Sequence, residues 1–131
     1  MTGGRCLCGA VTWEYEGDPN WIAHCHCESC RRNCAAPIVT FVGVPEAAFR
    51  WTGAAPAAFS SSPGVRRLFC GLCGTPVAYD AEAFDGEIHL YACGHDDPAA
   101  LSPTAHVHHA EALAWLPIGD GLRRYPKGGA A

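Results

Sequence analysis

Short runs in which apolar and polar residues alternate, separated by glycine and proline, predict that the chain is built mainly of β-strands. Residues 11–15 and 87–93 alternate with a period of two, which is typical of strands with one buried face. Residues 38–44 are rich in β-branched and aromatic side chains and are expected to form a buried strand. Further strands are expected over residues 21–26, 66–70 and 76–79.

Helical structure is expected only as short turns, over residues 27–33 and 97–101. In the second turn, Asp97 would act as the N-terminal cap, followed by a proline at the first position. Residues 53–64 are rich in glycine, proline and serine and are expected to form a loop with a short extended piece. Residues 127–131 are predicted to be a loose tail.

The composition agrees with a single mainly β domain over residues 1–131. Hydrophobic residues make up 49% of the chain, enough for a core, whereas 15 glycines and 10 prolines disfavour a helical bundle. The formal net charge of −4 disfavours binding to nucleic acid. No apolar run is long enough to span a membrane, and residues 1–5 do not resemble a secretory signal. We therefore expect a cytoplasmic protein without a membrane or nucleic-acid partner.

The nine cysteines are the most unusual feature of the chain. An odd number excludes a framework in which every cysteine is paired, and a reducing compartment favours metal binding over disulfides. Seven of the nine fall into three clusters, which are Cys6 and Cys8, then Cys25, Cys27 and Cys30, then Cys70 and Cys73.

The first and third clusters are predicted to share one structural zinc ion. Cys6 and Cys8 lie on the same face if their segment is extended, and Cys70 and Cys73 converge in a turn that a neighbouring glycine permits. Together they would supply four thiolates for a tetrahedral zinc site that closes a long loop. The alternative is two unrelated buried or redox cysteine pairs.

The middle cluster is predicted to hold a second, catalytic zinc ion. Cys25, Cys27 and Cys30 supply three sulfurs, which leaves one tetrahedral position for water or an incoming thiolate. The charges of Arg31 and Arg32 would help to keep these thiols deprotonated. The alternatives are that the three thiols carry no metal, or that a fourth protein ligand closes the site.

Histidines are weaker candidates for that fourth position. If residues 24–27 are extended, His24 and His26 point away from the cysteines between them, so we expect solvent or substrate there. More distant alternatives are His106, His108 and His109. The two isolated cysteines, Cys34 and Cys93, are expected to be small core residues.

The motifs in chain order resemble the glutathione-dependent formaldehyde-activating enzyme family, which also includes centromere protein V. The resemblance rests on GRCLCGAV at residues 4–11, CHCESCRR at 25–32 and RLFCGLCGTP at 67–76. Weaker matches follow at residues 103–107 and 120–122. One departure is that family members often carry glycine at the position of Ala35.

This resemblance implies small antiparallel sheets held by zinc, a fold shared with type B methionine sulfoxide reductases and a Rab-associated zinc protein. It also implies ligand roles that agree with the spacing argument. The structural zinc ligands would be Cys6, Cys8, Cys70 and Cys73, and the catalytic zinc ligands Cys25, Cys27 and Cys30.

The resulting hypothesis is a carbon–sulfur lyase-class enzyme that adds a thiol, with glutathione preferred, to formaldehyde or another small aldehyde. Arg31 and Arg32 would bind glutathione carboxylates, although they could equally cover the surface and pair with Glu28.

Two other functions remain open from the sequence. The first is a non-catalytic zinc-binding module for a thiol, a metal or a protein partner, with a surface formed by tryptophans such as Trp21, Trp51 or Trp115, although each is expected in the core. The second is a methionine sulfoxide reductase that uses Cys34 or Cys93 as its nucleophile.

Overall fold

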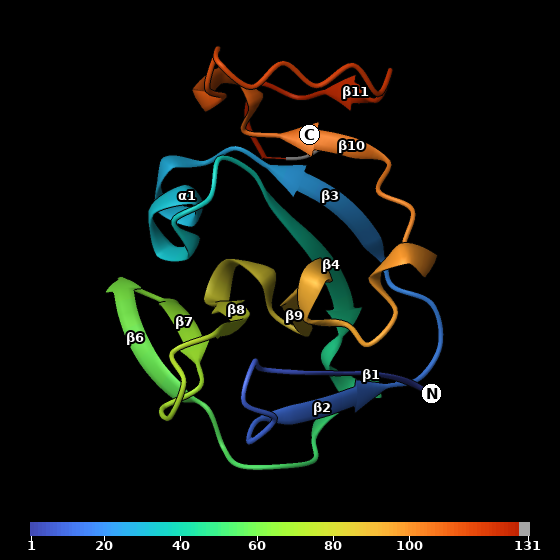
Figure 1. Ribbon diagram of the computed structural model, residues 1–131, viewed down its shortest axis with the longest axis vertical. Coiled ribbons are helices and arrows are strands. Elements are labelled where there is room, and N and C mark those ends of the chain that lie inside the picture. Colours follow the sequence, from blue (N-terminus) through green and yellow to red (C-terminus); the bar gives the residue numbers. More distant parts are fainter. Residues whose placement is uncertain (129–131) are drawn as a thin grey trace.

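A small antiparallel sheet closes one end of the molecule in the computed structural model, which describes residues 1–128 (Figure 1). Its strands are arranged in the order β1-β2-β5. They are β1 (Thr2–Arg5), β2 (Thr12–Tyr15) and β5 (Phe49–Trp51).

A larger sheet of eight strands has the order β11-β10-β3-β4-β9-β8-β7-β6. Most neighbours in this sheet are antiparallel, but β10 runs parallel to both β3 and β11. The strands are β3 (Trp21–Cys25), β4 (Val39–Pro45), β6 (Ala57–Ser62), β7 (Val65–Phe69), β8 (Pro76–Ala81), β9 (Glu87–Tyr91), β10 (Ala105–Val107) and β11 (Arg123–Arg124).

Helices are short and lie between the strands. The α-helix α1 (Glu28–Cys34) follows β3 directly, and the 3-10 turns are η1 (Glu46–Ala48), η2 (Glu82–Phe84), η3 (Ala92–Gly94), η4 (Pro98–Ala100) and η5 (His109–Glu111). None of the helices between residues 1 and 128 has the length and apolar composition needed to span a bilayer.

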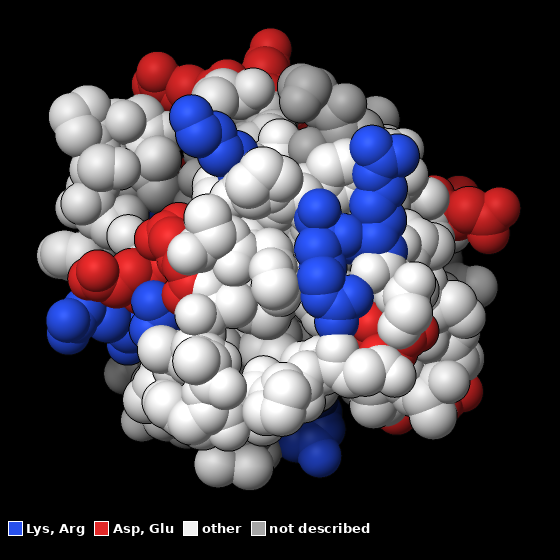
Figure 2. Space-filling view, turned by 90° about the horizontal axis from the view of Figure 1, so that it is seen from above, with Lys and Arg blue, Asp and Glu red and all other residues white. Residues whose placement is uncertain are grey.

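At the end of the molecule that carries β10 and β11, acidic and basic side chains are both present, with uncharged surface between them (Figure 2).

The mainly β fold predicted from the sequence is confirmed. All six expected strands are present within one or two residues, and β6 is the extended piece expected inside the loop. Both predicted helical turns form, although the Asp97 side chain makes no capping hydrogen bond. The predicted tail lies partly outside the described residues, at 129–131. Within the described part, the Lys127 carbonyl accepts a hydrogen bond from the His108 backbone N–H.

The sequence pattern did not reveal β1, β5, β10 or β11, which are all four residues long or shorter. The sequence of β1 is Thr-Gly-Gly-Arg, which has no apolar alternation. Its position depends on packing instead, because a Cβ atom on Gly4 would lie 2.1 Å from the ring of Trp13. Only glycine allows this close approach of two strands.

Two clusters of buried residues form the core. The larger one lies between the two sheets and includes Trp13, Val42 and Leu90. The smaller one contains Cys25 and Cys30 together with three buried residues of the neighbouring strands, which are Val39, Phe41 and Tyr91. The cysteines of the predicted catalytic site are therefore part of the hydrophobic core.

Candidate functional site

The first and third cysteine clusters meet in space. Cys6 and Cys8 lie in the turn after β1, and Cys70 and Cys73 lie in the turn between β7 and β8. One sulfur from each residue lies within 4.8 Å of the other three. The sulfur atoms of Cys6 and Cys8 are 3.6 Å apart, and those of Cys8 and Cys70 are 3.8 Å apart. A tetrahedron with metal–sulfur bonds of about 2.3 Å has edges of about 3.8 Å, so the four residues can bind a metal ion.

Backbone donors surround these sulfurs. The Val11 N–H donates to Cys6 Sγ at 3.3 Å, and the N–H groups of Leu72 and Cys73 both donate to Cys70 Sγ at 3.4 Å. Such donors favour the thiolate form, which is the form that binds metal. The hydroxyl and backbone N–H of Thr75 lower the pKa of Cys73 to about 5. All nine cysteines are free thiols, so no disulfide replaces the metal.

The middle cluster gathers around Cys30. Cys25 ends β3, Cys27 is the N-terminal cap residue of α1, and Cys30 is buried within the helix. Cys25 and Cys30 belong to one buried cluster, and Cys27 packs against it. The three sulfurs do not, however, form a group in residues 1–128 whose members all lie within 4.8 Å of one another. They are therefore a looser set of ligands than the four cysteines of the other site.

An arginine that the sequence analysis did not single out lies against this cluster. Arg67 on β7 is 7% exposed, and its Nη1 donates to Cys30 Sγ at 3.6 Å. The hydrogen bond from Cys25 and the Arg67 guanidinium together lower the pKa of Cys30 to about 6. Arg67 also lies over the ring of Tyr79, 5.1 Å from its centroid. Because β7 also contains Arg66, which is exposed, its sequence did not single out Arg67 as the buried arginine.

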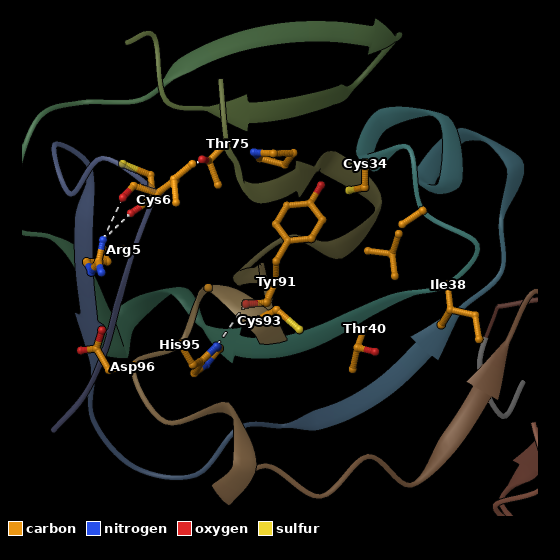
Figure 3. A pocket seen from close by; sticks show the side chains of 15 residues that line it. Arg5, Cys6, Cys34, Ile38, Thr40, Thr75, Tyr91, Cys93, His95 and Asp96 are labelled. Atoms are coloured by element: carbon orange, nitrogen blue, oxygen red, sulfur yellow. Dashed lines mark hydrogen bonds between the residues drawn. The ribbon is translucent and has the colours of Figure 1, made fainter. Parts of the chain in front are cut away.

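A cavity of about 580 Å³ borders the four-cysteine site through Cys6, whereas Cys25, Cys27 and Cys30, all among the described residues, do not line it (Figure 3). Cys6 and Thr75 line it on the side of the four-cysteine site, and Cys34 and Tyr91 line it on the side of the middle cluster. Tyr91 also belongs to the buried cluster that contains Cys25. Figure 3 shows the Tyr91 side chain extending toward Cys34.

Arg5 contributes positive charge to the cavity wall. Its Nη1 donates to the carbonyl oxygens of Cys6 and Leu7 at 3.1 and 3.0 Å. Within residues 1–128, no carboxylate forms an ion pair with Arg5. Its remaining N–H groups can therefore bind an anionic ligand.

The two arginines expected to bind substrate have partners within the protein. Arg31 Nε donates to the His26 carbonyl, and its Nη2 donates to the Glu111 carbonyl, at 3.0 and 3.2 Å. Arg32 forms an exposed ion pair with Glu28 at 3.0 Å, as in the surface alternative. Neither arginine lines the cavity.

The histidines expected to point away from the cysteines do so. His26 Nε2 lies 2.8 Å from His106 Nδ1, and His24 Nδ1 lies 2.7 Å from Thr40 Oγ1. The rings of His26 and His109 are also in contact. These residues form a cluster that is separate from the thiols of Cys25 and Cys30.

Two expectations about buried residues were wrong. Cys93 is exposed, because the alternation of β9 ends at Tyr91 and the chain turns into η3. Trp115, expected in the core, is 70% exposed. Cys34 is half-buried and packs against the Cys25 cluster, so it is close to the core position that was expected.

The backbone conformation at Ala35 explains why the family motif has glycine at this position. It ends α1 with a φ of 50°, in the left-handed region that favours glycine. A glycine at this position is therefore what the backbone geometry prefers.

The mainly β fold, in which two cysteine pairs 62 residues apart bring four sulfurs together, defines a cysteine-rich β protein with a thiol group able to hold a metal ion. The sequence pattern of a family described as "Glutathione-dependent formaldehyde-activating enzyme" (GFA) matches residues 1–111, and the chain belongs to this family.

Two individual proteins are similar to this chain. The "Uncharacterized lyase C29B12.13" of Schizosaccharomyces pombe (strain 972 / ATCC 24843) is 29% identical over 76 residues, which cover 58% of this chain and 55% of that protein. The match thus spans about half the length of this relative. The crystal structure of a Rhodobacter sphaeroides protein has the same fold, with a TM-score of 0.62 and 19% identity over 77% of this chain and 91% of the other.

Proposed function

We propose that this protein is a zinc-dependent carbon–sulfur lyase-class enzyme that adds a thiol, with glutathione preferred, to formaldehyde or another small aldehyde. The family description names both glutathione and formaldehyde, and the name of the yeast relative includes the word lyase. The observation that carries the proposal is a cavity lined by Cys6 of the four-cysteine site and by Cys34 and Tyr91, which pack with the middle cluster. We also propose that residues 1–131 act as one domain.

We propose two zinc ions with different roles, of which only the first has four sulfurs within 4.8 Å of one another in residues 1–128. Cys6, Cys8, Cys70 and Cys73 would hold the structural ion, because their four sulfurs already approach a tetrahedron. The second ion would be held by the three thiols around Cys30. When bound there, zinc would supply Lewis-acid polarisation of the aldehyde carbonyl and stabilisation of the substrate thiolate.

The reaction needs no further co-reactant. A carbon–sulfur bond forms between the thiol sulfur and the carbonyl carbon, and the π electron pair moves to the oxygen, which takes up the proton that the thiol has lost. Burial raises the pKa of Tyr91, so its hydroxyl stays protonated at neutral pH. Tyr91 lines the cavity and can donate a hydrogen bond to the developing alkoxide.

Glutathione carboxylates need a cation at the cavity. Arg5 is the better placed candidate, because it lines the cavity and lacks a carboxylate partner in residues 1–128. Arg31 and Arg32 remain candidates only if binding releases their contacts to Glu111 and Glu28. Glutathione as co-substrate also favours a reducing, cytoplasmic setting without nucleic-acid or membrane partners.

The alternative function is a non-catalytic zinc-binding module. The exposure of Trp115, together with Leu7 at 80% and Leu72 at 82%, favours a surface for a partner. Elemental analysis separates the two functions: one zinc ion per chain that resists chelation, without a second labile one, would favour the module.

The test of the enzyme is the rate of adduct formation from glutathione and ¹³C-formaldehyde, followed by NMR exchange measurements. We expect the wild type to exceed the uncatalysed rate and Cys27→Ala to fall to it with an unchanged far-UV circular dichroism spectrum. The matched control is Trp115→Ala, an exposed position outside the cavity. If the rates with and without wild-type protein coincide, the proposed activity is wrong.

A further inference from the structure

A second group of potential metal ligands lies at the far edge of the large sheet. One ring nitrogen each of His24 and His106 and one carboxylate oxygen of Asp120 lie within 4.8 Å of one another. These residues belong to β3, β10 and the segment before β11, which lie side by side (Figure 1). None of the three is part of the cysteine sites.

Strand register explains why the two histidines meet. In the parallel pair β3–β10, His106 lies directly opposite His24. Residues opposite each other on neighbouring strands project from the same face of the sheet, so the two imidazole rings lie with their centroids 4.8 Å apart and their planes tilted by 34°. The residue next to His24, Cys25, belongs to the other face for the same reason.

Hydrogen bonds from surrounding residues orient both rings. His24 Nδ1 pairs with Thr40 Oγ1 at 2.7 Å, and His106 Nδ1 pairs with His26 Nε2 at 2.8 Å. Histidines that bind metal through one nitrogen usually donate the other N–H to such a partner. This leaves the Nε2 atom of each ring available on the side that faces Asp120.

The carboxylate of Asp120 is oriented in the same way. Its Oδ1 accepts the Leu122 backbone N–H at 3.0 Å, and its Oδ2 lies 2.7 Å from His106 Nε2. Arg124 Nη1 lies 3.6 Å from Oδ1, and its positive charge disfavours a metal cation nearby. The same guanidinium also donates hydrogen bonds to the carbonyl oxygens of Leu122 and Ile118. Oδ2 is therefore the oxygen that an ion would bind in place of the His106 Nε2 proton.

We propose that His24, His106 and Asp120 form a binding site for a divalent transition-metal ion, separate from the cysteine sites. Two imidazoles and one carboxylate are a donor set used for zinc and for non-haem iron, with further positions left for water. Without an ion, His106 donates its Nε2 proton to Asp120. On binding, the ion replaces this proton: the proton on His26 Nε2 moves to His106 Nδ1, and His26 takes up the displaced proton at its own Nδ1, so that His106 then donates to His26.

The burial of the three residues fits such a site. His106 is fully buried and is held on both sides, whereas the Asp120 side chain is 28% exposed. An ion can therefore reach the carboxylate from solvent and meet a fixed imidazole behind it. Oriented ligands reduce the entropy that ion binding costs.

Cobalt(II) is the probe for this site, because cobalt bound to thiolates absorbs strongly in the near ultraviolet whereas cobalt bound to nitrogen and oxygen does not. The thiolates of the reduced chain are first saturated with two equivalents of zinc, which binds sulfur in preference to nitrogen and oxygen ligands, unbound zinc is removed by gel filtration, and cobalt is then added. We expect one further cobalt ion per chain, no thiolate absorption band, and two exchangeable histidine N–H signals shifted by the paramagnetic ion in proton NMR.

Variants then identify the ligands. Asp120→Asn preserves the shape of an exposed side chain, and it should weaken cobalt binding by more than about 100-fold and remove the shifted signals. His24→Gln should do the same, and His108→Gln, at a half-exposed histidine outside the group, should leave binding unchanged. The proposal is overturned if the zinc-saturated wild type takes up no cobalt, or if Asp120→Asn binds it equally well.

Discussion

Removing the metal cross-link between the two distant cysteine pairs should destabilise the whole domain. The perturbation is the double substitution Cys8→Ser and Cys73→Ser, which takes one ligand from each pair. Cys8 is exposed and Cys73 is half-buried, so neither change opens a cavity in the core. The buried ligands, Cys6 and Cys70, remain in place without an ion to join them.

The magnitude follows from the length of the loop. Cys8 and Cys70 are 62 residues apart in sequence, and a cross-link over such a loop stabilises a fold by about 4 kcal/mol in the chain-entropy model. This is a large fraction of the roughly 5–15 kcal/mol that separates folded and unfolded states of a typical domain. At roughly 4 °C per kcal/mol, the melting temperature should fall by about 15 °C.

The assay is thermal unfolding, followed by circular dichroism in zinc-containing buffer with a reductant. Cys93→Ser is the matched control, because Cys93 is also an exposed cysteine but contacts neither metal group. A chelator should lower the melting temperature of the control and of the wild type toward that of the double variant. If the double variant melts within about 3 °C of the control, the cross-link does not stabilise the fold.

Two further changes test the backbone and the charged core. Ala35→Gly should stabilise the domain by about 0.5–1 kcal/mol, because Ala35 has a positive φ. Ala36→Gly is the control and should destabilise the domain. Urea denaturation measures both changes in the free energy of unfolding, and changes of the same sign would refute this. Burial alone would raise the pKa of Glu87, but hydrogen bonds that include one from Trp21 Nε1 hold it below its ordinary value of 4.5. Glu87→Gln should therefore cost about 1–2 kcal/mol at pH 7, and the difference should vanish as the pH falls through the lowered pKa. Urea denaturation at pH 7 and pH 3 measures the free energy of unfolding of the wild type and the variant. An equal difference between the two proteins at both pH values would contradict the lowered pKa of Glu87.

The metal chemistry of the four-cysteine site was predictable because its parts are local. Cys6 and Cys8 are separated by one residue, and Cys70 and Cys73 by two, so each pair converges whatever the rest of the chain does. The strands were predictable for a similar reason, since a period of two is visible within five or six residues. The short strands were not, because β1 contains two adjacent glycines and no apolar alternation.

The environment of the middle cluster was not predictable in the same way. Arg67 reaches Cys30 from a strand 37 residues further along the chain. Its side chain lies there because β7 and α1 pack over the same core, and no local pattern in either segment specifies the other. Likewise, Cys93 was expected in the core because the end of β9 cannot be located from alternation alone.

The amino-acid sequence by itself determined where most strands form and which cysteines are spaced as pairs that can hold a metal ion. The tertiary structure alone decided that β10 lies parallel to β3 and brings His106 to His26 across 80 residues, and that a cavity opens beside Cys6 of the four-cysteine site. The physical reason is that spacing fixes only neighbours a few residues apart. Contacts between distant segments depend on the packing free energy of the entire fold, to which every residue contributes.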